Sequence, residues 1–284
     1  SEKDIKKSNF YLNISNFLNP KFKFNLGLFA ENFYEIGNFE LSEFYFDKFQ
    51  NNNPIYNWYK LKRKAEIIKN KKNSKSSFNF IYAEFNKIKS PSPRVIFDMA
   101  NIAKNFEKYD LSIKYYSKIL LNLKQDSLFY ADILYRRGSC YERLGNFKKS
   151  DIDFLNSLKI NEDSYTLNYL AYSWLERNYK VDAAIQMLEK ANEKNKDDPY
   201  IIDSVGWGYY LTQDYIRAEV YLRRAVRMMP NDPTVNDHYG DVLWKLQRGI
   251  EANYFWKNVL TFEDTKDEMK NNINLKLLKG IAKI

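Results

Sequence analysis

Small residues recur every 34 positions in the second half of this 284-residue chain, and this spacing constrains its fold more than any other feature. One series consists of Ser150, Ala184, Ala218 and Ala252, and a second of Ser157, Ala191 and Ala225. A period of about 20–50 residues is typical of repeat proteins, in which each short unit buries its apolar surface only against its neighbours. The sequence therefore predicts a stack of similar units and no single central core.

One complete unit spans residues 199–232. Counting Pro199 as position 1, positions 7, 8, 11, 20, 24, 27 and 32 hold Val205, Gly206, Tyr209, Ala218, Leu222, Ala225 and Pro230. This pattern predicts two helices joined by a short turn. Such helices approach closely only where small side chains meet, so we expect Gly206 to face Ala218. Pro230 ends the second helix, because it lacks a backbone donor and disfavours helix in the preceding residue.

The same pattern extends through most of the chain and predicts an all-α solenoid. We expect seven helix pairs, at 23–54, 55–92, 93–130, 131–164, 165–198, 199–232 and 233–266. A further helix precedes them within 1–22, and a capping helix follows within 267–284, where apolar residues recur every four positions. The alternative for this last helix is an amphipathic helix on a membrane surface, because Lys270, Lys276, Lys279 and Lys283 accompany the apolar residues.

The ends and loops of the chain give three further expectations. The repeat pattern is already present by residue 23 and the first residue is serine, so we expect a processed chain or a fragment of a longer array. The longest apolar stretches fall far short of the roughly 18 residues of a transmembrane helix. The lysine-rich segment 69–77 is the one part that we expect to be disordered.

The repeat register also predicts which side chains face the concave side of the solenoid. Positions 4, 7, 8 and 11 of each first helix are buried, so positions 2, 5, 6, 9 and 13 should point outward. From residue 164 onward we assign to this face Asn168, Tyr169, Tyr172, Asp203, Ser204, Trp207, Asp237, His238 and Asp241. These aromatic and acidic residues would suit an extended, basic peptide. The alternative is that Trp207 and Tyr172 only pack against adjacent helices and that His238 is a scaffold residue.

The net charge of +9 suggests a second kind of partner. Most of the excess lies in one stretch, formed by Lys60, Lys62, Arg63, Lys64, Lys69, Lys71, Lys72 and Lys75 and opposed in sequence only by Glu66. Clustered cations attract nucleic acid or another polyanion. The alternative is an ordinary solvated surface, in a chain whose richness in Lys, Asn, Ile, Phe and Tyr is typical of an AT-rich genome.

Residues for catalysis or cofactor binding are not apparent. A single histidine and a single cysteine exclude a multi-histidine or thiolate metal site, and we expect Cys140 to be a small buried apolar residue. The segment Gly206-Trp207-Gly208 is not a phosphate-binding loop, because close helix packing explains both glycines. We therefore expect no enzymatic activity, no cofactor and no metal.

Four runs of sequence resemble the C-terminal repeats of proteobacterial, especially alphaproteobacterial, tetratricopeptide repeat proteins. They are SLFYADILYRRGSCYERLGNF at 127–147, LNYLAYSWLERNYKVDAAIQMLEKA at 167–191, DDPYIIDSVGWGYYLTQDYIRAEVYLRRAVRMMPNDPTVNDHYGDVLWKLQRGIEANYFWKNVL at 197–260 and NLKLLKGI at 274–281. The resemblance implies a right-handed superhelical solenoid that acts as a binding scaffold. Relatives similar in the DSVGW and HYGDVLW segments include outer-membrane lipoproteins that recruit a C-terminal-processing protease. The resemblance thus implies a bacterial protein, and it favours a periplasmic or membrane-associated location over a cytoplasmic one.

The chain departs from those relatives in two respects. It has no lipidated N-terminal cysteine, and it lacks the Lys, Asn and Arg clamp with which chaperone-binding tetratricopeptide domains hold a terminal carboxylate. Asp203 and Asp237 occupy the inner face instead. The sequence predicts a non-enzymatic scaffold or adaptor for a protein or extended peptide, such as an assembly subunit or a processing protease. The alternative is a helical-repeat binder of RNA or another polyanion through residues 60–75.

Overall fold

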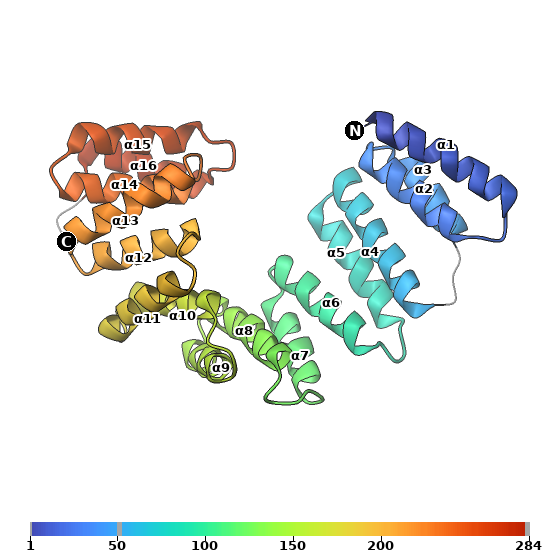
Figure 1. Ribbon diagram of the computed structural model, residues 1–284, viewed down its shortest axis with the longest axis horizontal. Coiled ribbons are helices and arrows are strands. Elements are labelled where there is room, and N and C mark those ends of the chain that lie inside the picture. Colours follow the sequence, from blue (N-terminus) through green and yellow to red (C-terminus); the bar gives the residue numbers. More distant parts are fainter. Residues whose placement is uncertain (1, 50–52, 282–284) are drawn as a thin grey trace. The chain divides into compact units, whose positions relative to one another are not determined.

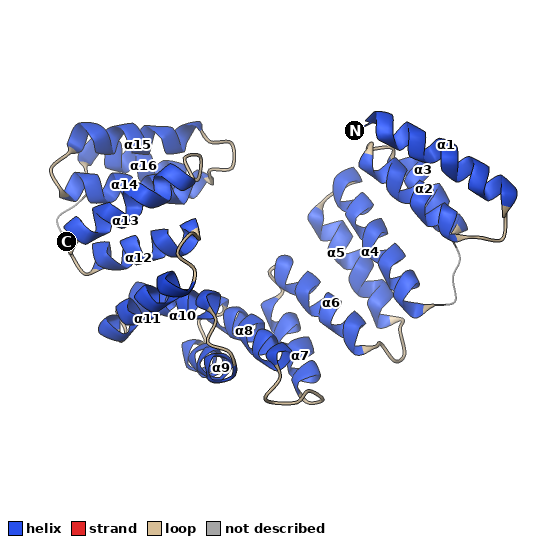
Figure 2. Ribbon diagram, in the orientation of Figure 1, coloured by secondary structure: helices blue, strands red, loops and turns tan. Residues whose placement is uncertain are grey.

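The computed structural model describes residues 2–49 and 53–281, and these residues form sixteen helices and no strand (Figure 1 and Figure 2). The all-α architecture predicted from the sequence is therefore confirmed. The helices are α1 Glu2–Leu18, α2 Phe24–Glu35, α3 Phe39–Lys48, α4 Pro54–Lys71, α5 Ser74–Asn86, α6 Pro93–Asn105, α7 Tyr109–Leu120, α8 Leu128–Arg143, α9 Phe147–Ile160, α10 Ser164–Glu176, α11 Val181–Lys194, α12 Pro199–Leu211, α13 Tyr215–Met228, α14 Pro233–Lys245, α15 Gly249–Thr261 and α16 Asp267–Lys279.

The chain divides into two compact units, unit 1 at Ser1–Asn122 and unit 2 at Leu123–Ile284. In both units the helices from α2 to α15 pack chiefly in consecutive pairs, α2 with α3 through α14 with α15. Helix α1 packs against α2, and α16 packs against α15. The pairs follow the seven ranges proposed from the sequence, except that three first helices begin early, α4 at Pro54, α8 at Leu128 and α10 at Ser164. We retain the division into seven repeats as a proposal.

The helices begin where the sequence supplies capping residues. Ten of them start after an Asn, Ser or Asp whose side chain accepts a hydrogen bond from a backbone N–H of the first turn. Capping also corrects the expectation of disorder at 69–77, which was wrong. Helix α4 continues to Lys71, and Asn73 caps α5 by accepting from the backbone N–H of Ser76, so only two residues lie between these helices.

In three pairs of unit 2, a glycine of the first helix lies against a large residue of the second. A Cβ atom built on Gly206 would lie 2.6 Å from Leu222 Cγ, and one built on Gly240 would lie 2.5 Å from Trp256 Nε1. The predicted partner of Gly206 was Ala218, whereas the nearest atoms belong to Leu222. Helical side chains lean toward the N-terminus of their own helix, so the residue one turn beyond Ala218 reaches back over the glycine.

In the three pairs of unit 1, a serine of the second helix bonds to the backbone of the first. The hydroxyl groups of Ser42, Ser77 and Ser112 donate to the carbonyl oxygens of Ala30, Ala65 and Ala100 at 2.8, 2.6 and 2.8 Å. All three serines are buried. Each bond joins residues twelve positions apart, so the second helix passes close to the backbone of the first at the same point in each pair.

We predict that Gly206→Ala destabilises the chain by about 1–3 kcal/mol, because the added methyl group would overlap Leu222 and force the two helices apart. The matched control is Gly27→Ala, where the new Cβ would lie 3.8 Å from the Phe49 ring, an ordinary contact distance. Thermal or urea unfolding of the two variants measures the difference. Equal effects of both substitutions would contradict the assigned packing.

Candidate partner-binding groove

A groove of about 490 Å³ lies on the first helices of successive pairs in unit 2. Its walls come from α8, α10, α12 and α14. Of the residues assigned to the concave face, Asn168, Tyr169, Tyr172, Asp203, Ser204 and His238 line it, whereas Trp207, Asp237 and Asp241 do not. The lining also includes residues that the sequence analysis missed: Glu142, Arg143, Ser173, Glu176, Tyr200 and Thr234.

Helix α10 contributes five residues to the lining of the groove, because these five lie on one face of the helix. Asn168, Tyr169, Tyr172, Ser173 and Glu176 all line the groove, and residues spaced by three or four positions fall on one side of a helix. The helix starts at a defined point because Asp163 accepts a hydrogen bond from the Thr166 backbone N–H. Two missed residues follow from the same register, since Glu176 is position 13 counted from Ser164 and Tyr200 is position 2 counted from Pro199.

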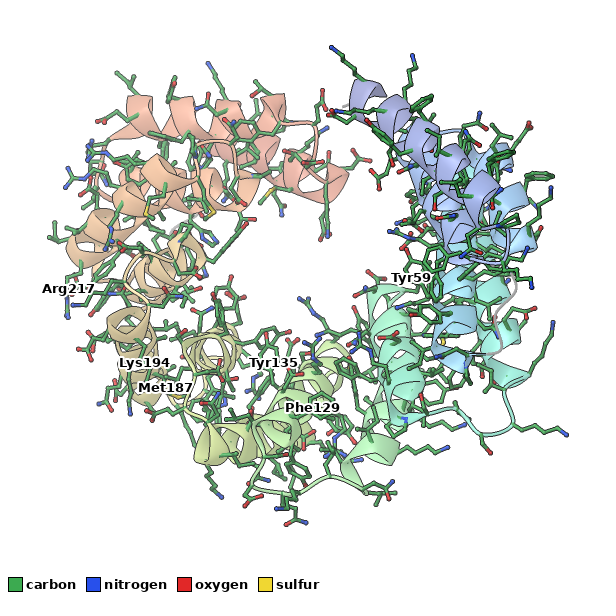
Figure 3. The ribbon with its side chains drawn as sticks, turned by 45° about the vertical axis from the view of Figure 1, so that its right-hand side comes forward. Tyr59, Phe129, Tyr135, Met187, Lys194 and Arg217 are labelled. Carbon is green, nitrogen blue, oxygen red and sulfur yellow. The ribbon has the colours of Figure 1, made fainter. Side chains whose placement is uncertain are left out.

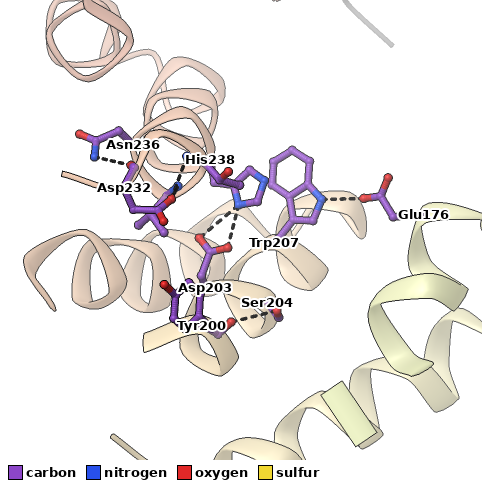
Figure 4. A network of polar contacts seen from close by, with 10 residues as sticks. Glu176, Tyr200, Asp203, Ser204, Trp207, Asp232, Asn236 and His238 are labelled. Atoms are coloured by element: carbon purple, nitrogen blue, oxygen red, sulfur yellow. Dashed lines mark hydrogen bonds and ion pairs between the residues drawn. The ribbon is translucent and has the colours of Figure 1, made fainter. Parts of the chain in front are cut away.

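Asp203 and His238 form a buried pair at one end of the groove (Figure 4). His238 Nδ1 lies 2.9 and 3.1 Å from the two carboxylate oxygens of Asp203. Burial alone would lower the pKa of His238, but the carboxylates of Asp203, Asp237 and Asp241 outweigh it, so the pKa is raised. The imidazole therefore tends to carry the charge that neutralises Asp203.

Trp207 connects this pair to the open part of the groove. Its ring stacks on the His238 imidazole with centroids 4.0 Å apart, and on Tyr210 at 4.6 Å. Its indole Nε1 donates to Glu176 at 3.0 Å. Trp207 is partly buried, so the expectation that it stands exposed as a contact surface was wrong. Stacking on His238 of α14 covers one face of the ring, in agreement with the alternative that Trp207 packs against an adjacent helix.

The predicted acidic strip is also wrong as a surface feature. Asp203 and Asp241 are 7% and 5% exposed, and Asp237 is partly buried. Lys276 of α16 lies 2.5 Å from Asp237 and 2.7 Å from Asp241, and Trp256 Nε1 donates to Asp241 at 3.0 Å. Burial and the neighbouring Asp237 raise the pKa of Asp241 to about 6. The last helix therefore compensates the aspartates of α14.

Two glutamates carry the negative charge of the groove instead. Glu142 accepts a hydrogen bond from the Tyr169 hydroxyl at 3.1 Å and lies 3.6 Å from Arg143. Glu176 is exposed, accepts from Trp207 and is also hydrogen-bonded to Tyr172. Burial, followed by these carboxylates, raises the pKa values of Tyr169 and Tyr172, so both hydroxyls remain protonated donors at neutral pH.

Asn168 adds an unused acceptor to the groove. Its Oδ1 atom is buried and has no hydrogen-bond partner among the described residues. Buried polar atoms are almost always hydrogen-bonded in native proteins. Asn168 therefore lines the groove with a buried acceptor that the described residues leave unpaired.

The basic stretch in unit 1 is largely neutralised by acidic residues of neighbouring helices. Its helix, α4, is marked by Tyr59 in Figure 3. The pairs are Lys62–Asp98 at 2.8 Å, Arg63–Glu31 at 2.9 Å, Arg63–Glu66 at 2.6 Å, Lys64–Asp47 at 2.5 Å, Lys60–Asp47 at 3.9 Å and Lys71–Glu43 at 2.5 Å. Lys69 and Lys72 are exposed. Glu66 is the only acid within this stretch of sequence, and the packing of neighbouring helices brings Glu31, Glu43, Asp47 and Asp98 near the same cations.

Three further observations on the described residues concern the single cysteine, metal binding and membrane-spanning helices. Cys140 is fully buried on α8, as expected of a small apolar residue. The described residues contain no group of three or more His, Cys, Asp and Glu side chains arranged to hold a metal ion. Within the same part of the chain, no helix combines the length and apolar character needed to cross a bilayer.

Comparison with known proteins supports the repeat fold. Residues 131–164 match the model of the family described as Tetratricopeptide repeat. TPR repeat-containing protein PA4667 of Pseudomonas aeruginosa is 32% identical over 111 residues, which cover 39% of this chain and 19% of that protein. Protein bimA of Emericella nidulans is 30% identical over 76 residues, covering 27% of this chain and 9% of that protein. The chain thus spans less than a fifth of either relative.

Solved structures show the same architecture. A tetratricopeptide repeat protein from Parabacteroides merdae superposes with a TM-score of 0.70 at 15% identity, covering 90% of this chain and 98% of the other. TTC0263, a tetratricopeptide repeat protein of Thermus thermophilus, gives a TM-score of 0.56 at 16% identity and covers 66% and 100%. At these identities the likeness concerns the fold alone. The chain therefore has the all-α repeat fold of these tetratricopeptide repeat proteins.

We predict that the chain is less stable at about pH 8 than at about pH 6. Because the pKa of His238 is raised above its unfolded value, its stabilising contribution is complete below about pH 6.5 and is lost as the pH rises through the folded pKa. The raised pKa of Asp241 acts in the same direction, since the folded chain holds that proton more tightly. Melting temperatures in buffers of equal ionic strength measure the effect.

The control for this prediction is His238→Gln, which removes the titrating group and keeps a polar side chain of similar reach. The difference in melting temperature between the two pH values should shrink in this variant. An undiminished difference would show that other groups control the pH dependence.

Proposed function

We propose that this chain is a non-enzymatic scaffold or adaptor that binds an extended segment of a partner protein in the groove of unit 2. The observation that supports it most directly is the combination, in one groove, of aromatic side chains, a solvent-exposed carboxylate and an unpaired buried acceptor. Such a site offers shape, charge and backbone recognition together.

The rigidity of the groove favours an extended segment over a folded surface. Each wall is a helix, and the side chains on these walls are held by hydrogen bonds and ring stacking with neighbours. An extended segment brings unpaired backbone N–H groups, and Asn168 Oδ1 would accept a hydrogen bond from one of them. Tyrosine contributes large contact area at low conformational cost, which is why it is frequent among residues that dominate binding.

The resemblance to alphaproteobacterial tetratricopeptide repeat proteins narrows the partner further. We propose that the segment belongs to a subunit of a larger assembly or to a processing protease. Support for this comes from the DSVGW and HYGDVLW segments, which carry Asp203, Trp207, His238 and Asp241 of the buried network.

We predict that Tyr200→Ala weakens partner binding by at least about 1 kcal/mol, because Tyr200 lines the groove and offers its ring to the bound segment. The partner would be identified by affinity capture from the native cell and then titrated calorimetrically against purified variants. Tyr254→Ala is the matched control, since Tyr254 on α15 has the same 62% exposure and lies outside the groove. Loss of binding in the control alone would place the interface elsewhere.

For the polyanion alternative we predict only weak binding of generic RNA, which is lost at about 150 mM salt. Neighbouring carboxylates already pair with Lys62, Arg63, Lys64 and Lys71, so few counterions would be released on binding. A gel-shift titration at rising salt measures this. Sub-micromolar, sequence-dependent binding at that salt, abolished when Lys62, Arg63 and Lys64 are changed together to Glu, would favour the alternative.

A further inference from the structure

We propose that the groove selects its partner through one arginine side chain, which seats against Glu176. This inference rests on the proposed function, because it names the chemistry of the segment that the same groove would bind. Such a groove would prefer a cationic side chain, whereas the clamp of chaperone-binding tetratricopeptide domains binds a terminal carboxylate. Its basis is the contrast between Glu176 and the other acidic residues of the groove.

The carboxylate of Glu176 is bound by two hydrogen-bond donors but forms no ion pair with a cation of the described residues. Trp207 donates to it at 3.0 Å and Tyr172 is also hydrogen-bonded to it, and both donors are neutral (Figure 4 shows the Trp207 bond). No Lys, Arg or His lies within ion-pair distance of it among the described residues. Neutral donors orient a carboxylate but leave its charge intact. An incoming cation therefore meets a positioned counter-ion and displaces no existing ion pair.

The remaining charges of the groove cancel in pairs. Glu142 lies 3.6 Å from Arg143, and Asp203 lies 2.9 Å from His238. The raised pKa of His238 favours its charged form, so this second pair is close to neutral. The lining then carries one net negative charge, and that charge is on Glu176. A segment ending in a carboxylate would be repelled at this point, whereas a cationic side chain would be attracted.

Arginine fits this position better than lysine. Its guanidinium is planar and can stack on an aromatic ring while it donates to a carboxylate. Tyr172 contacts Glu176 directly, and Tyr169 and Tyr200 line the same groove. The ammonium group of lysine is more strongly hydrated and cannot make the flat stacking contact. Asn168, on the same face of α10, would accept a backbone N–H beside the bound arginine.

The test uses the whole chain and a phage library of random 12-residue peptides. Selected peptides are synthesised, and those weakened by Tyr200→Ala are taken as groove binders. We expect these peptides to share an arginine, and replacement of that arginine by its neutral isostere citrulline to weaken binding about tenfold or more. Glu176→Gln, which retains an acceptor for Trp207 and Tyr172, should cause a similar loss and should abolish the preference for arginine over citrulline.

The matched control is Glu193→Gln, on an exposed glutamate of α11 outside the groove, which should leave the affinity of the same peptides unchanged. Melting temperatures of both variants confirm that they are folded. Groove peptides that lack arginine, prefer lysine or ignore Glu176→Gln would overturn this inference and leave the proposed function standing. If no selected peptide is sensitive to Tyr200→Ala, the proposed function itself fails.

Discussion

The contact between a glycine on the first helix and a large residue on the second sets the geometry of three helix pairs that contribute to the groove. Gly138 lies against Phe154, Gly206 under Leu222 and Gly240 under Trp256, and a Cβ at the last two positions would overlap its neighbour. This contact brings the first helices α8, α12 and α14 close to their partners α9, α13 and α15. Tyr172, Asp203 and His238 line one groove although they belong to three different pairs.

The partner that a later helix gives to each carboxylate in or beside this groove determines whether the negative charge is neutralised. The acids of α14 are compensated by Lys276 of α16, and Asp203 of α12 is compensated by His238 of α14. Glu176 of α10 receives an indole N–H and a tyrosine hydroxyl instead. An indole or phenol donor costs little to bury beside a carboxylate and leaves its negative charge in place. The stack thus stabilises three aspartates internally and presents one glutamate to solvent.

The parts of the fold that depend on local spacing could be predicted from the sequence. The 34-residue spacing of Ser150, Ala184, Ala218 and Ala252 indicated helix pairs, and the all-α fold followed from it. The groove was predicted less well, because burial of Asp203 and Asp241 depends on contacts with residues 35 positions away. The repeat register predicts which way a side chain points, but it does not predict which residues of other elements cover that side chain. Full use of positions 2 and 13 would have found Tyr200 and Glu176.

His238 connects the stability of the stack to the charge of its groove. When the imidazole is protonated, it neutralises Asp203, and the groove presents the charge of Glu176 alone. When the proton is lost, Asp203 becomes a second negative charge on the same lining, and the buried ion pair that stabilised α12 against α14 disappears. Rising pH therefore weakens the packing of these helices while it strengthens the attraction of the groove for a cation. A bound arginine would offset part of the lost stability, since a ligand that binds only the folded chain stabilises it by an amount that grows with the logarithm of the ligand concentration divided by Kd.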